Sequence, residues 1–147
     1  MNWFKRLLSG GSEHEAASPA ARRMMEHGTL PTADSIVNVW LVVDRTTAAS
    51  LQGKSRTDVI MAAGRMIMLL DHGIFPAIAD WMKSNNCTYS ILGGEAFDDE
   101  SLFHGVREAS SRMGTRTIQS VENCRAFLIR KGQSETGGSV AVVVGMR

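Results

Sequence analysis

Histidine is the side chain of this chain whose charge changes most readily near neutral pH, and a carboxylate beside it could support acid–base chemistry. Four histidines occur, at positions 14, 27, 72 and 104. His72 follows Asp71, and His104 lies four residues after Glu100. A carboxylate that orients an imidazole can produce a general base, but a histidine near the end of a helix also interacts favourably with the helix dipole. We therefore assign no catalytic residue, and a small enzyme with a His/carboxylate site assembled in three dimensions remains an alternative.

Oxygen ligands for a metal could follow the apolar run at residues 36–43. Over residues 36–71 the chain is faintly similar to a von Willebrand A-type domain, in which a strand ends in Asp-x-Ser-x-Ser and these oxygens bind Mg²⁺. Asp44 and Thr46 match the first two ligand positions, but Ala48 has no side-chain oxygen. We expect Asp44 to cap the following turn, and we predict neither a metal site nor a cofactor.

An acidic run follows Gly93-Gly94 and could mark a divalent-cation or basic-partner site; it comprises Glu95, Asp98, Asp99 and Glu100. Acidic groups also stabilise the first turn of a helix, which is the simpler interpretation. The same charges would repel a phosphate at that helix terminus, so the two glycines do not indicate a nucleotide site.

Basic residues accumulate toward the C-terminus, where residues 101–147 carry seven basic and three acidic side chains. The arginines that could bind a polyanion are Arg107, Arg112, Arg116, Arg125 and Arg130. Nucleic-acid surfaces interleave such residues with aromatic rings for stacking, and only Phe103 and Phe127 lie nearby. We therefore interpret the arginines as a solvated face and do not expect nucleic acid as a partner, with a weak nucleic-acid-binding module as an alternative.

Length and composition describe one globular domain. The chain has 147 residues, of which 44% are hydrophobic and 21% charged, close to the globular average. Cys87 and Cys124 form no metal-binding pair, and two free thiols are typical of a reducing cytoplasm. No apolar run approaches the ~20 residues of a membrane span. We predict a bacterial, cytoplasmic protein.

Hydrophobic periodicity predicts alternating strands and helices over residues 29–147. Strands are expected at 36–43, 87–92 and 140–144, and helices at 58–71, 76–83 and 98–113, with Asp58 capping the first helix. Residues 46–56 are expected to be a loop, while 115–131 fit both a helix and a strand. The fold class is therefore α/β or α+β: a single domain with a central sheet packed by helices.

A short amphipathic segment precedes this domain and occupies, with a short helix, residues 1–28. Trp3, Phe4, Leu7 and Leu8 share one helical face, while Lys5 and Arg6 point away. This face could fold back on the domain, dock in a groove of a partner protein, or rest on a membrane surface through residues 1–8.

These patterns favour a non-enzymatic interaction or adaptor domain, a subunit of a larger bacterial assembly. The four apolar side chains at positions 3, 4, 7 and 8 are the predicted partner-binding residues. The expected partner is another protein, and a homo-oligomer is a further option.

Overall fold

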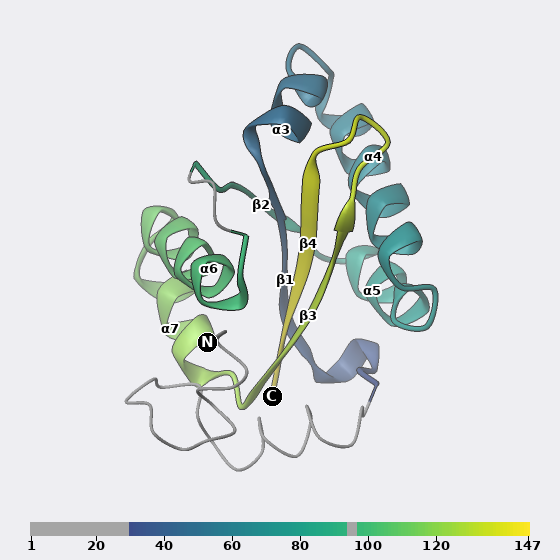
Figure 1. Cartoon of the computed structure of the whole chain (residues 1–147). Coiled ribbons are helices and arrows are strands. Elements are labelled where there is room, and N and C mark those ends of the chain that lie inside the picture. The colour runs from purple at the N-terminus through teal and green to yellow at the C-terminus, as the bar shows by residue number, and fades with distance from the viewer. Residues whose placement is uncertain (1–29, 94–96) are drawn as a thin grey trace.

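A four-stranded mixed sheet forms the centre of the computed structural model, which describes residues 30–93 and 97–147. Its strands are β1 (Ile36–Val43), β2 (Thr88–Ile91), β3 (Ala126–Gln133) and β4 (Ser139–Met146), in the order β2-β1-β4-β3. β1 and β2 are parallel, whereas β4 runs antiparallel to both β1 and β3. β1, β2 and β3 therefore all end at one edge of the sheet, called the upper edge below (Figure 1).

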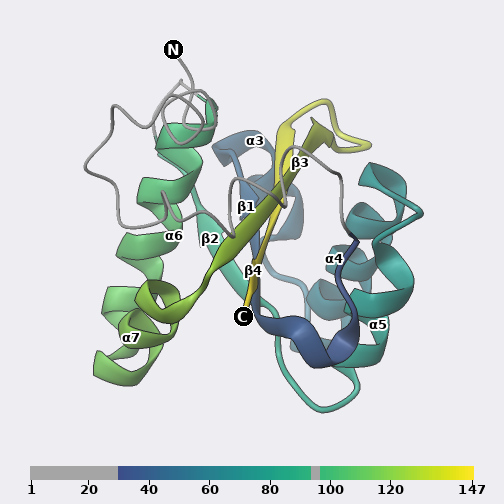
Figure 2. The same ribbon diagram turned by 90° about the horizontal axis from the view of Figure 1, so that it is seen from below.

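Helices cover both faces of this sheet. α3 (Arg45–Leu51), α4 (Arg56–Leu70) and α5 (Phe75–Met82) follow β1 and lie on one face. α6 (Asp99–Met113) and α7 (Thr115–Asn123) follow β2 and lie on the other (Figure 2). A 3-10 turn, η1 (Ala33–Ser35), leads into β1. No helix of the described residues is both long and apolar enough to cross a membrane.

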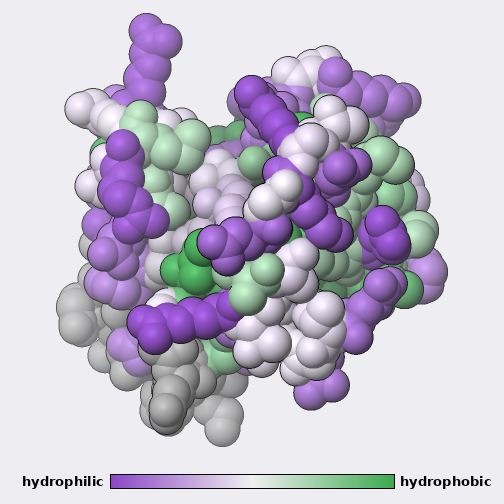
Figure 3. Space-filling model, turned by 90° about the horizontal axis from the view of Figure 1, so that it is seen from above, coloured by the Kyte–Doolittle hydropathy of each residue, from purple (hydrophilic) through white to green (hydrophobic). Residues whose placement is uncertain are grey.

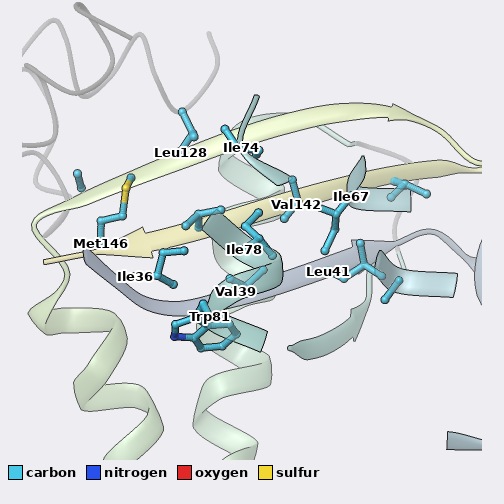
Figure 4. Close-up of a cluster of buried hydrophobic side chains, with 14 of the residues drawn as sticks. Ile36, Val39, Leu41, Ile67, Ile74, Ile78, Trp81, Leu128, Val142 and Met146 are labelled. Atoms are coloured by element: carbon cyan, nitrogen blue, oxygen red, sulfur yellow. The ribbon is translucent and has the colours of Figure 1, made fainter. Parts of the chain in front are cut away.

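The central strands are apolar on both sides because a core lies on each side of them. Val39 and Leu41 of β1 pack with Ile67 of α4 and Ile78 of α5 (Figure 4). Trp40, on the opposite face of β1, belongs to a second core that α6 and α7 close. Alternate residues of one strand thus stabilise both halves of the molecule.

Aromatic side chains fill the second core. The Phe103 and Phe127 rings meet edge to face with their centroids 5.0 Å apart, and the Trp40 and Phe127 centroids are 6.5 Å apart. The indole Nε1 of Trp40 donates a hydrogen bond of 3.0 Å to the Oγ of Ser110. This bond satisfies a polar group that would be costly to bury alone.

The predicted single domain with a central sheet packed by helices is confirmed. β1, β2, β4, α4, α5 and α6 occur where periodicity placed them, with ends that differ by a few residues. The undecided stretch 115–131 contains α7 followed by most of β3. The predicted segment 1–28 and its partner-binding residues Trp3, Phe4, Leu7 and Leu8 lie outside the described residues.

Two local expectations are wrong. The stretch 46–56 is not a continuous loop, because α3 occupies residues 45–51 and buries Thr47 and Leu51 against the sheet. Such burial can stabilise a helix of seven residues, which is too short to be stable from propensity alone. The cap of α4 is Ser55, whose Oγ accepts a hydrogen bond from the Asp58 N–H, so Asp58 lies in the first turn rather than at the cap.

Candidate functional site

Asp44 ends β1 at the upper edge and holds three segments together. Its Oδ1 accepts a hydrogen bond of 2.9 Å from the Thr47 N–H, and its Oδ2 accepts one of 2.8 Å from the Ser139 N–H. Burial opposes the charge, but these hydrogen bonds outweigh it and lower the pKa of Asp44 below its usual value. The carboxylate therefore caps α3 and ties it to the start of β4.

The von Willebrand-like metal position has no ligand set around it. Both Asp44 oxygens accept backbone hydrogen bonds, and Ala48 lies within α3. Residues 30–93 and 97–147 contain no group of three or more His, Cys, Asp or Glu side chains that could hold a metal ion. The arrangement around Asp44 is that of a helix cap.

A chain of hydroxyl groups links α3 to the turn between β3 and β4. The Thr47 Oγ1 lies 3.0 Å from the Ser134 Oγ, which lies 2.9 Å from the Thr136 Oγ1 and accepts a hydrogen bond from the Gly138 N–H. Thr47 is fully buried, so its hydroxyl depends on this partner. No sequence signal indicated this link, because its members are almost 90 residues apart.

The two described histidines lie at the surface. His104 Nε2 is 3.9 Å from Glu108 Oε2, and both side chains are exposed, so the pair is a loose contact across one helical turn. His72 is also exposed, while the neighbouring Asp71 accepts hydrogen bonds from Arg130 Nε and the Gly73 N–H. Neither histidine lines one of the hollows described below.

The five predicted polyanion-binding arginines are divided between two faces of the molecule. Arg107 and Arg112 lie on α6 and pair with Glu122 and Glu108 at 3.3 Å and 3.9 Å. Arg130 extends from β3 to the opposite side, where its Nε donates to Asp71 Oδ2 at 2.8 Å. The remaining two arginines, at positions 116 and 125, are exposed. Position 130 thus does not join a common surface with those on α6.

A pocket of about 200 Å³ lies beneath the turn between β3 and β4 and is called the hairpin pocket below. Residues from α3, from α4 and from this turn supply its walls; Figure 1 labels the two helices. Its lining combines apolar side chains with charged and hydroxyl groups; it consists of Ser50, Leu51, Lys54, Ala62, Arg65, Met66, Leu69, Leu70, Gln133, Ser134, Glu135, Thr136 and Val140.

A wider groove of about 590 Å³ lies beside β2 and is called the β2 groove below. Its lining is mostly apolar and consists of Arg45, Ala48, Ala49, Leu51, Gln52, Val59, Tyr89 and Ile91. Tyr89 is 37% exposed and Ile91 51% exposed. In a view from above the upper edge, hydrophobic residues lie in a hollow of a more hydrophilic surface (Figure 3).

Comparison with known proteins adds no assignment to these surfaces, since no family model, no curated protein and no solved structure matches the chain.

Proposed function

We propose that the chain is a non-enzymatic interaction domain of a larger bacterial cytoplasmic assembly, and that it binds an extended segment of a partner protein along the outer edge of β2. The observation that carries this proposal is the coincidence of exposed apolar side chains in the β2 groove with a strand edge that no other strand of residues 30–93 and 97–147 pairs with. The predicted partner-binding residues of the N-terminal segment would supply a second contact; they are Trp3, Phe4, Leu7 and Leu8.

The backbone of β2 presents hydrogen-bonding groups to a partner. β2 is the edge strand next to β1, and the Leu92 N–H donates to the Val43 carbonyl at 2.8 Å. Because alternate residues of a strand direct their N–H and C=O groups to opposite sides, those of Tyr89 and Ile91 point away from β1. An added strand would pair with these two residues.

The side chains of the same two residues supply the apolar contact. Tyr89 and Ile91 are in register with Leu41 and Val43, which point toward the face that carries α3, α4 and α5. Tyr89 and Ile91 therefore share that face, where Ala48, Ala49 and Val59 form the opposite wall of the groove. Strand addition of this kind obtains affinity from the backbone and specificity from alternate side chains.

This geometry defines the chemistry of the partner segment. It should be extended, with apolar side chains at two alternate positions that enter the groove. Arg45 lines the end of the groove, near Gly93, and favours an acidic residue of the partner at that point. A partner segment with basic residues at the two alternate positions that enter the groove should not bind.

A photo-crosslinking residue at position 91 tests the proposal in the producing cell. The matched control carries the same residue at position 113, because Met113 is 60% exposed on α6 in the opposite layer. We expect position 91, but not position 113, to yield an adduct with another protein. Equal adducts at both positions, or none at 91, would contradict the proposal. An adduct of twice the chain's mass would show that the segment bound at β2 comes from a second copy of this chain and not from a different protein.

Two substitutions at position 91 test the backbone and the side-chain contributions to binding. Ile91→Pro removes an N–H that points away from β1, and proline is tolerated in an edge strand. Ile91→Thr retains that N–H and removes apolar surface. We expect both variants to remain folded and to lose the adduct captured from a reporter at position 89. Retention of the adduct in Ile91→Pro would show that no strand is added.

A further inference from the structure

The hairpin pocket shares Leu51 with the β2 groove, but it is smaller and more charged side chains line it. An apolar floor is formed by Leu51, Ala62, Met66, Leu70 and Val140. At a volume of about 200 Å³ it is smaller than the roughly 300–1,000 Å³ pockets that hold drug-sized ligands. A ligand that fits must therefore be small and must present an apolar body to this floor.

The wall opposite α4 is held in place by hydrogen bonds and close packing. Ser134 at the start of the turn bonds to the buried Thr47, which fixes the turn to α3. On the adjoining strand, a Cβ at Gly132 would lie 2.5 Å from the Leu70 Cδ2, so the absent side chain allows Leu70 to pack directly against β3. The pocket is thus largely formed before any ligand enters, which lowers the cost of binding.

Two cationic side chains line the pocket from the helical side. Lys54 precedes α4, Arg65 lies within it, and both are exposed. Neither belongs to any ion pair within the described residues. Glu135, on the turn, is the only acidic residue among the lining residues. The lining therefore carries a net charge of +1 beside an apolar floor.

We propose that the hairpin pocket binds a small monocarboxylate with an apolar chain. The chain lies on the apolar floor, and the carboxylate pairs with Arg65 and Lys54. Guanidinium groups match the planar carboxylate with two parallel hydrogen bonds. Glu135 repels the ligand's charge and so weakens binding. This inference does not depend on the proposed partner segment, because Arg65, Lys54 and Glu135 do not line the β2 groove.

Octanoate is the probe, and its binding to the full chain is measured by calorimetric titration. Octanol has the same chain without the charge, acetate has the charge without the chain, and octylamine reverses the sign of the charge. We expect saturable binding of octanoate only, with one molecule per chain. Equal binding of octanol would show that the pocket binds apolar chains without recognising the carboxylate, which would overturn the proposal. The absence of octanoate binding at millimolar concentration would also overturn it.

Three variants test the charges. Arg65→Gln should weaken octanoate binding about tenfold, the cost of one charge-assisted hydrogen-bonded pair. Glu135→Gln should strengthen it, because the Glu135 carboxylate repels that of octanoate. Arg56→Gln is the matched control, because Arg56 lies on the same helix outside the pocket and should bind like the parent. An equal loss in Arg56→Gln and Arg65→Gln would contradict a specific site.

Discussion

The Nζ of Lys131 lies 2.7 Å from the Oδ1 of Asp99, and this ion pair connects an edge strand of the sheet to the first turn of α6. The Asp99 side chain is 3% exposed, whereas that of Lys131 is 40% exposed. Arg130, the preceding residue, points to the other face and bonds to Asp71 at the end of α4. Neighbouring residues of β3 thus fasten one helix on each side of the sheet.

Replacement of Lys131 should destabilise the fold, because it leaves the buried Asp99 carboxylate without this partner. We expect Lys131→Met to lower the free energy of unfolding by about 1–3 kcal/mol. The loss should fall below that of a fully buried pair because Lys131 is partly exposed. Lys83→Met is the control, since Lys83 and Asp80 form an exposed pair, and its effect in chemical denaturation should be much smaller than that of Lys131→Met. Equal effects would contradict a structural role for the pair.

The bond between Asp71 and Arg130 should make stability depend on pH. Burial opposes ionisation of Asp71, but the hydrogen bonds from Arg130 and Gly73 outweigh it and lower the pKa of Asp71. The stabilisation is therefore present above the unfolded-state pKa of about 4 and is lost as the pH falls through the folded-state value. Asp71→Asn should cost about 1 kcal/mol at pH 7, and its difference from the parent should shrink below pH ~4. A difference that is constant from neutral to acid pH would refute this.

Two glycines should respond to alanine in opposite directions. A Cβ at Gly138 would lie 2.5 Å from Asp44 Oδ1 and 2.9 Å from the Thr47 N, so Gly138→Ala must displace the cap of α3. We expect a loss of about 1–3 kcal/mol. A Cβ at Gly64 in α4 would meet no atom within 4 Å outside the backbone of its own helix, so Gly64→Ala should stabilise the protein by about 0.5–1 kcal/mol. Thermal or chemical unfolding measures both, and a neutral Gly138→Ala would show that the turn yields easily.

The thiols should be unreactive in the folded protein. Burial raises the pKa of Cys124 to about 12, and likewise that of Cys87 to about 12. The thiolate is the reactive form, so a disulfide reagent at pH 8 should label neither cysteine quickly until denaturant is added. Cys124 is buried and Cys87 half-buried, so Cys124 should react last. Rapid labelling of both in native buffer would contradict the packing around them.

The N-terminal apolar face should be required for partner binding rather than for folding. Trp3→Ala combined with Phe4→Ala should leave the melting temperature unchanged and reduce the adduct formed at position 91. A lower melting temperature of the isolated protein would show instead that the segment folds back on the domain. Should both the melting temperature and the adduct match the parent, the segment contributes neither to folding nor to partner binding.

The amino-acid sequence by itself determined the elements with strong periodicity. The β-branched run at 36–43 is apolar at nearly every position, as a strand with a core on each face requires, and it forms β1. The helix expected at 98–113 forms α6, with Asp98 as its N-cap and Gly114 as its C-cap, residue types that favour helix ends. These signals are local, because propensity and capping act over a few residues, and they were enough to predict a helix-packed sheet.

Tertiary structure alone decided the rest, because it depends on contacts between residues far apart in the chain. Burial of Thr47 and Leu51 forms α3 where local composition indicated a loop, and the insertion of β4 between β1 and β3 gives a mixed sheet. The alternation of β3 separates Arg130 from the arginines on α6, although all lie in one basic stretch of sequence. The hairpin pocket combines residues 50–70 with 133–140, and no local pattern encodes that proximity.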